Sequence, residues 1–107
     1  MKFNDETVQG VWENARAMND RDSSEWRKDV CGAWIRRDQY GSQASEFGWK
    51  IESITSGEQL TLENLRAYQH ENSFVLATDK ARCLVTADRE GISPTASIDT
   101  PRNKSAG

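Results

Sequence analysis

The sequence has few of the residues from which metal sites, disulfide frameworks and large apolar cores are built. One histidine and two cysteines are too few for a disulfide framework or a four-ligand zinc site. Only 18 of 107 residues are Leu, Ile, Val or Phe, a share just under the level at which disorder becomes the default. No apolar run approaches the roughly 18 residues of a membrane-spanning helix, and the first five residues lack the apolar segment of a secretory signal. We therefore expect a cytoplasmic protein without membrane contact, in which Cys31 and Cys83 are reduced thiols.

An excess of one charge is also lacking. The chain has 14 basic and 17 acidic residues, which gives a net charge of −3. Disordered chains usually combine low hydrophobicity with a high net charge, so this composition favours one small folded domain. The low pI of about 5.1 argues against avid nucleic-acid binding but leaves room for a local basic patch.

Large aromatic residues are what the sequence does have. Two tyrosines and three phenylalanines accompany four tryptophans, which are Trp12, Trp26, Trp34 and Trp49. Because each large ring buries well over about 100 Å2, the composition predicts a thin core anchored by aromatic rings and braced by polar contacts.

The first half of the chain predicts one helix and two strands. Apolar residues at helical spacing, from Val8 to Met18, predict an amphipathic helix over residues 5–19 with Asn4 or Asp5 as its N-cap. Residues 33–40 and 48–54 have the punctuation and alternation of strands, and we expect them to form a hairpin with an open loop.

The second half predicts another helix. Apolar and amide side chains from Leu62 to Leu76 share one helical face, which indicates a helix over residues 61–78. Residues 82–87 fit either a strand or a helix end. We expect one domain over residues 1–90 and a flexible tail over 91–107, where Ser, Thr, Pro and Gly dominate. The expected fold class is α+β.

The order of these elements and of several short motifs resembles the small bacterial HNH endonuclease family. The resemblance covers about residues 8–80 and rests on Asp22, Trp26-Arg27, Asp29, Gly32, Ile35, Tyr40-Gly41, the segment Ser45-Glu46-Phe47-Gly48-Trp49 with Ile51, Asn64-Leu65 and Glu71-Asn72. It implies a ββα-metal arrangement, in which a β-hairpin and the following helix enclose a divalent metal. It also implies that a histidine acts as the general base. The metal ligands would be a carboxylate and a later His or Asn.

The sequence departs from that family at the positions that carry the chemistry. Ser53 stands at the position of the general base, and a hydroxyl does not accept a proton near neutral pH as an imidazole does. Ser73 stands at a later ligand position, where serine is a poor ligand for a divalent ion. Glu52 replaces the family's aspartate and can still bind a hard cation. We therefore expect no catalytic residues, no metal and no cofactor.

His70 is the one side chain that could substitute for a missing ligand. A lone histidine without clustered carboxylates is more often a surface or core-edge residue than a metal ligand. The alternative is a divalent-metal-dependent endonuclease with an atypical site built from Glu52, His70 and Asn72.

The densest basic cluster is the candidate contact surface. It comprises Arg27, Lys28, Arg36 and Arg37, which could contact phosphates or a protein partner, although a solvated strand face is the plainer interpretation. The expected scaffold residues are Trp12, Trp26, Asp29, Trp34, Tyr40, Trp49 and Asn64. Arg27 is expected to pair with a buried carboxylate.

These features predict a catalytically inactive HNH-like protein that acts by binding. Its partner would be a protein or a nucleic acid, and its role that of an adaptor, inhibitor or regulator related to a phage or mobile element. The oligomeric state and the partner's identity do not follow from the sequence.

Overall fold

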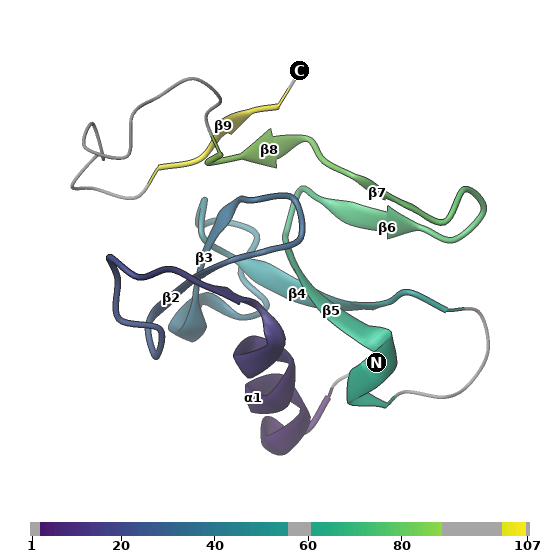
Figure 1. The fold of residues 1–107 in the computed structure, drawn as a ribbon, viewed down its shortest axis with the longest axis horizontal. Helices are drawn as coiled ribbons and strands as arrows, with labels where there is room; N and C mark the ends of the chain where they lie inside the picture. Colours follow the sequence, from purple (N-terminus) through teal and green to yellow (C-terminus); the bar gives the residue numbers. More distant parts are fainter. Residues whose placement is uncertain (1–2, 56–60, 89–101, 107) are drawn as a thin grey trace.

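The computed structural model describes residues 3–55, 61–88 and 102–106, and these form short antiparallel sheets around one helix (Figure 1). The elements in chain order are α1 (Asp5–Asn14), β1 (Arg16–Ala17), β2 (Trp26–Lys28), β3 (Trp34–Arg36), the 3-10 turn η1 (Arg37–Gln39), β4 (Trp49–Ser53), the 3-10 turn η2 (Leu62–Asn64), β5 (Leu65–Gln69), β6 (Ser73–Val75), β7 (Lys80–Arg82), β8 (Val85–Thr86) and β9 (Lys104–Ser105). No helix within the described ranges is long and apolar enough to cross a membrane.

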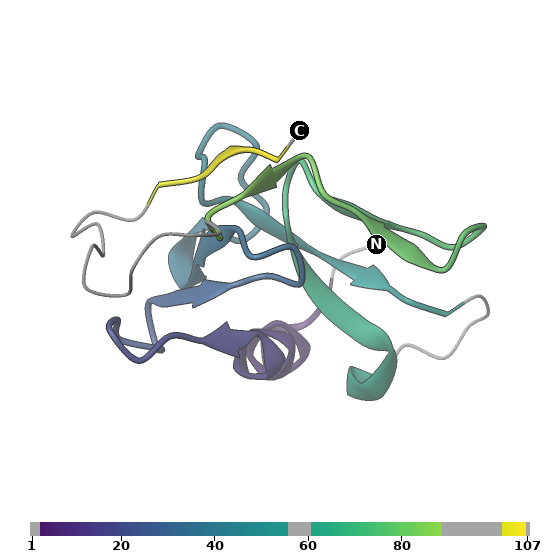
Figure 2. The ribbon, with the colours of Figure 1, turned by 45° about the horizontal axis from the view of Figure 1, so that its top comes forward.

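Antiparallel pairing in register defines four small sheets. One sheet has the order β1-β2-β3, and the other three are the pairs β4-β5, β6-β7 and β8-β9. The longest pairing runs from Trp49 opposite Gln69 to Ser53 opposite Leu65. The β6-β7 hairpin reaches away from α1 and the strands that pack on it (Figure 2).

The core lies between α1, β3 and the β4-β5 pair. Trp12 and Trp49 are fully buried and pack with their ring centroids 5.4 Å apart. Tyr40 packs on the other side of Trp49 at 4.9 Å. Val8, Val11, Ile35, Leu65 and Ala67 complete this cluster. Aromatic rings therefore supply much of the core volume that large aliphatic side chains supply in other domains.

The expected ββα arrangement is wrong, because the segment 61–78 is not a helix. Apart from the single turn η2, this segment forms β5 and β6. Its apolar spacing also fits a strand, since Leu65 and Ala67 alternate into the core while β4 supplies a pairing partner along all five residues of β5. Long-range pairing of this kind overrides a helical pattern.

The expected hairpin between residues 33–40 and 48–54 is also wrong. β3 pairs with β2, β4 pairs with β5, and a single parallel bridge from Tyr40 to Trp49 joins the two predicted strands. The first helix begins as predicted, with Asn4 accepting from the Thr7 N–H group, but it ends at Asn14 rather than at residue 19. It ends there because Arg16 and Ala17 pair with β2 instead.

Two further expectations differ from the structure. Cys31 and Cys83 form a disulfide, so the expectation of reduced thiols is wrong. Residues 82–87 were expected to form either a strand or a helix end, and within them Val85 and Thr86 form strand β8. The expected flexible tail is described only at residues 102–106, where β9 pairs with β8; the rest of it lies outside the described residues.

Candidate binding site

Glu52, Ser53 and Ser73, which stand where the HNH family has its catalytic residues, make structural contacts. Glu52 lies in β4, where one carboxylate oxygen accepts the Phe74 N–H group at 2.6 Å and the other lies 3.6 Å from Lys50 Nζ. The Ser53 hydroxyl donates to the Thr55 carbonyl at 2.9 Å. Ser73 opens β6, opposite Arg82. Glu52 thus connects β4 to β6 by a hydrogen bond. Ser53 stabilises the turn at Thr55, and Ser73 takes part in the pairing of β6 with β7.

His70 and Glu52 do not converge on one point. Glu52 pairs with Arg66, and His70 lies four residues further along from Arg66, which corresponds to roughly 13 Å of strand. The His70 side chain instead lies 3.8 Å from the Glu71 carboxylate, and the backbone N–H group of His70 donates to the Gly48 carbonyl. Across the described ranges, no three His, Cys, Asp or Glu side chains gather as a metal site would require.

Arg27 and Lys28 hold the scaffold together rather than forming an open basic patch. Arg27 donates to the carbonyls of Glu13, Ala15 and Ser23, so its partners are backbone oxygens and not the buried carboxylate that was expected. Lys28 is 7% exposed, and its ammonium group lies 2.9 Å from Asp88 and 5.0 Å from the Trp34 ring centroid.

Arg36 ends β3, Arg37 begins η1, and the two side chains contact different neighbours. Arg36 lies over the Trp26 ring at 5.2 Å and near Asp38, while Arg37 donates to Gln9 at 2.8 Å. The four predicted contact residues are therefore divided among separate structural roles.

A buried carboxylate organises the centre of the molecule. Asp29 is 2% exposed, and its oxygens accept from the Ala33 N–H group, the Gln69 N–H group and the Asn72 side chain at 2.8–3.0 Å. Burial raises the pKa of Asp29 above its ordinary value, and the hydrogen bonds oppose that rise only in part. Asp29 thus joins the loop between β2 and β3 to the end of β5.

Asn72 extends this connection to β8. Its amide group donates to Asp29 and to the Val85 carbonyl at 3.0 Å, and its oxygen accepts the N–H groups of Leu84 and Val85. The side chain is fully buried. One asparagine therefore satisfies three backbone groups where the chain passes from β7 to β8.

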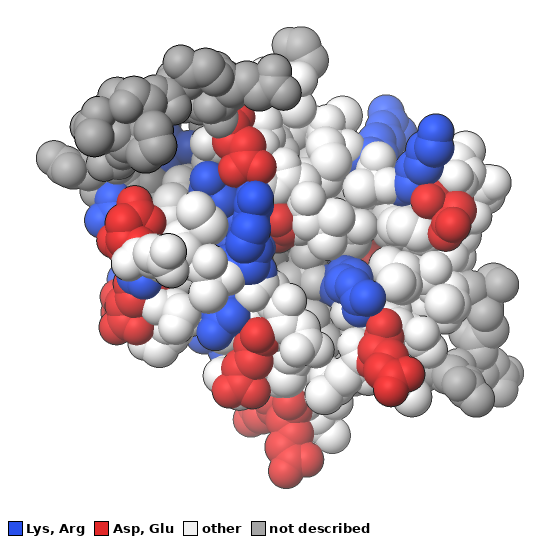
Figure 3. All heavy atoms as spheres, in the orientation of Figure 1, with Lys and Arg blue, Asp and Glu red and all other residues white. Residues whose placement is uncertain are grey.

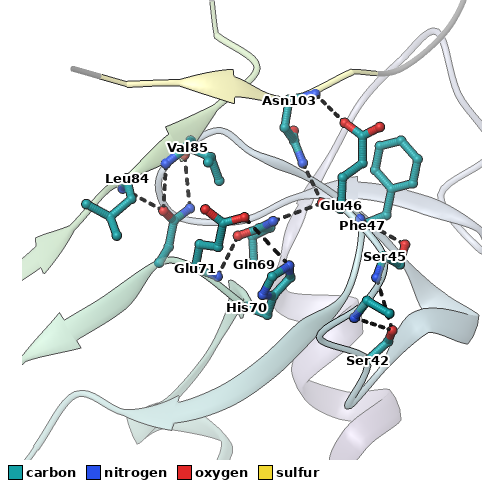
Figure 4. Close-up of polar contacts among 12 residues, drawn as sticks. Ser42, Ser45, Glu46, Phe47, Gln69, His70, Glu71, Leu84, Val85 and Asn103 are labelled. Carbon is teal, nitrogen blue, oxygen red and sulfur yellow. Dashed lines mark hydrogen bonds and ion pairs between the residues drawn. The ribbon is translucent and has the colours of Figure 1, made fainter.

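A second polar cluster attaches β9 to the loop before β4 (Figure 4). Asn103 donates to the carbonyls of Trp34 and Glu46 and accepts the Trp34 N–H group at 2.6 Å. Gln69 donates to the same Glu46 carbonyl at 2.9 Å. These contacts attach the described end of the chain, residues 102–106, to β3 and to the loop before β4.

The candidate site is a hollow of about 290 Å3 beside the end of α1. Val11, Ala15 and Ala67 supply apolar surface, and the cationic residues Arg16 from β1 and Arg66 from β5 also line the hollow. Val30, which is 57% exposed, also lines the hollow. Figure 3 shows one face of the molecule, on which Lys and Arg side chains are interspersed with Asp and Glu side chains.

The charges around the hollow leave an excess of positive charge. Arg16 and the nearby Lys28 share Asp88, with oxygen–nitrogen distances of 2.8 and 2.9 Å. Burial raises the pKa of Asp88, but hydrogen bonds from the two cations outweigh burial and hold that pKa below its ordinary value. Asp29 also lines the hollow, with both oxygens already hydrogen-bonded. The lining residues of the hollow thus include two cations, Arg16 and Arg66, and one carboxylate, Asp29.

Arg66 is the cation with unused capacity. Its hydrogen bonds within the described ranges use only Nη1, which donates to the carbonyls of Glu63 and Leu65 at 2.8 Å. A guanidinium group carries five N–H donors. Within the described ranges, the other N–H groups of Arg66 have no hydrogen-bond partner.

Sequence reasoning missed the residues that build this hollow. Arg16 fell inside the expected first helix and Arg66 inside the expected second helix, so neither was placed on a strand beside the other. Asp88 lies 72 residues from Arg16, and no local pattern connects them.

The chain was compared with protein-family models, curated proteins and solved structures, and none of them matches it.

Proposed function

We propose that the protein acts by binding a protein partner, and that an acidic side chain of this partner enters the hollow between Arg16 and Arg66. The observation that carries this proposal is the juxtaposition of apolar surface with the unused N–H donors of Arg66. A carboxylate can accept two parallel N–H groups from one guanidinium, which gives orientation as well as affinity.

The size of the hollow favours a side chain over a free ligand. Sites for drug-sized molecules occupy about 300–1,000 Å3 and enclose most of their ligand. The hollow has about 290 Å3, so it lies just below that range. One acidic residue with an apolar neighbour fits such a volume and can contact both Ala67 and Arg66.

The surface charge favours a protein over a nucleic acid as the partner. Nucleic-acid sites present a stripe of Lys and Arg to the phosphates. On the face in Figure 3, residues of both signs are interspersed, and the whole chain is acidic by three charges. The expected roles of adaptor, inhibitor or regulator all agree with protein binding.

The disulfide bears on the proposed compartment. Disulfides persist in oxidising environments and are rare in the cytosol. We propose that the Cys31–Cys83 pair is oxidised in the working protein, in place of the cytoplasmic location expected from reduced thiols. Treating the native cells with a thiol-alkylating reagent before lysis tests this. Alkylated Cys31 and Cys83 would show that both were reduced and would contradict the proposal.

The binding proposal is tested with a pair of small probes. We expect acetyl-Leu-Glu-amide to shift the backbone amide resonances of Ala15, Arg16, Arg66 and Ala67, and acetyl-Leu-Gln-amide to shift them much less. The Arg66→Gln variant should lose the response to the glutamate probe. Arg36→Gln, which removes a charge at a residue outside the hollow's lining, should keep it. Equal responses to both probes, or an unchanged response in Arg66→Gln, would contradict the proposal.

A further inference from the structure

The β6-β7 hairpin has one paired edge and one unpaired edge. β6 pairs with one side of β7, from Ser73 opposite Arg82 to Val75 opposite Lys80. Within the described ranges, no strand pairs with the other side of β7. An exposed strand edge of this kind presents backbone N–H and C=O groups that can template another strand.

The continuation of β7 already accepts a strand on that side. Between β7 and β8, the side-chain oxygen of Asn72 accepts the N–H groups of Leu84 and Val85. β9 lies on the side away from β6, where the Ala106 N–H group donates to the Leu84 carbonyl at 2.9 Å. Figure 1 shows β9 and β6 on opposite sides of the strand formed by β7 and β8.

The positive charge of β7 favours pairing with a strand that carries acidic residues. Lys80 and Arg82 are exposed, and because they are two residues apart they share one face of the strand. Neither forms an ion pair with any described residue. Figure 3 shows Lys and Arg side chains standing over this hairpin.

A second copy of the chain is a poor occupant of this edge. An antiparallel pairing of two β7 strands centred on Ala81 would place Lys80 opposite Arg82 twice, and like charges directly opposite each other destabilise a sheet. Edge lysines commonly prevent such self-association. Acidic residues opposite Lys80 and Arg82 would instead attract these two cations and stabilise the pairing.

We propose that the outer edge of β7 receives an extended acidic segment of a partner protein as an added antiparallel strand. The added strand continues the line of β9, hydrogen-bonds to the free backbone groups of β7, and places acidic residues opposite Lys80 and Arg82. Leu84, which is 45% exposed, lies next to this edge and offers apolar contact. The inference rests on the proposed function as a binding protein but uses a surface separate from the hollow.

The test uses two synthetic ten-residue peptides, one in which Glu alternates with Val and one in which Lys alternates with Val. We expect the Glu peptide to bind, to slow amide hydrogen exchange in residues 80–84, and to bind at least about tenfold more tightly than the Lys peptide. Lys80→Glu/Arg82→Glu should reverse this preference. Arg36→Glu, a charge reversal on another sheet, should leave it unchanged, and circular dichroism checks that each variant is folded.

Several results would overturn the inference. These are equal affinity of the two peptides, an unchanged preference in Lys80→Glu/Arg82→Glu, and concentration-dependent dimerisation that protects residues 80–84 without peptide. The hollow gives a separate readout, because its response to acetyl-Leu-Glu-amide is followed at Ala15 and Ala67. Failure at the hollow is therefore distinguishable from failure at the β7 edge.

Discussion

At the scale of single residues, the thin core depends on buried polar side chains. Asp29, Gln69 and Asn72 are at most 2% exposed, and together they connect the β2-β3 loop, β5 and β8. A buried polar group stabilises a fold when all of its hydrogen bonds are made and destabilises it when one partner is removed.

Replacing Asn72 should therefore be costly. Asn72→Leu keeps a similar volume but leaves the N–H groups of Leu84 and Val85 and one oxygen of Asp29 without this partner. We expect the free energy of unfolding to fall by about 3 kcal/mol in urea titration. Asn14→Leu, at an exposed position at the end of α1, is the control and should change it by less than about 0.5 kcal/mol. A loss below about 1 kcal/mol in Asn72→Leu would contradict this role.

Asp88 should make stability depend on pH. Its pKa in the folded protein is lowered by Arg16 and Lys28 despite burial, so its contribution is present above the unfolded pKa of about 3.9 and is lost as the pH falls through the folded value. Asp88→Asn should lower the free energy of unfolding by about 1 kcal/mol at pH 7, a modest value because the side chain is 49% exposed.

The comparison with wild type across pH identifies the cause. The difference between wild type and Asp88→Asn should shrink as the pH falls below about 4. Asp38→Asn, at a more exposed carboxylate 3.6 Å from Arg36, should have a smaller effect at pH 7. A difference that stays constant from pH 7 to pH 3 would show that the charge of Asp88 is not responsible.

At the scale of secondary structure, local patterns predicted some elements and failed at others for a physical reason. The start of α1 follows from Asn4 and from apolar residues at helical spacing, which are local signals. The segment 65–69 fits either periodicity, and only its pairing with β4 decides the outcome. The predicted strands 33–40 and 48–54 contain β3 and β4, but a single sequence does not reveal tertiary contacts, so the pairing of the strands and the hollow could not be predicted.

The disulfide illustrates the same limit. Two cysteines separated by 52 residues carry no sequence signal for pairing, and the fold brings them together. This bond links the β2-β3 loop to the segment between β7 and β8, which is otherwise held by Asn72 and by the contacts of β8.

Breaking this bond should lower stability. Chain-entropy arguments give about 4 kcal/mol for a closed loop of this length. We expect a reducing agent to lower the thermal unfolding midpoint of the wild type and to leave that of Cys31→Ser/Cys83→Ser unchanged. A wild-type midpoint that does not respond to reduction would contradict a structural role for the bond.

At the scale of the whole molecule, the chain combines a small aromatic core with a surface of mixed charge. The residues expected at a nuclease centre serve packing and pairing, while Arg66, Lys80 and Arg82 keep cationic groups free of ion pairs with described residues. These cationic groups are where we propose that acidic groups of a partner bind. Binding of a protein partner is therefore the central claim.

Affinity capture from the native host with matched variants tests this claim most directly. Wild type, Arg36→Gln, and Arg16→Gln/Arg66→Gln are immobilised, and the retained proteins are quantified by mass spectrometry. The account predicts a protein that wild type and Arg36→Gln retain equally and that the folded double variant retains at least about tenfold less. Equal retention by all three, or retention of nucleic acid alone, would contradict it.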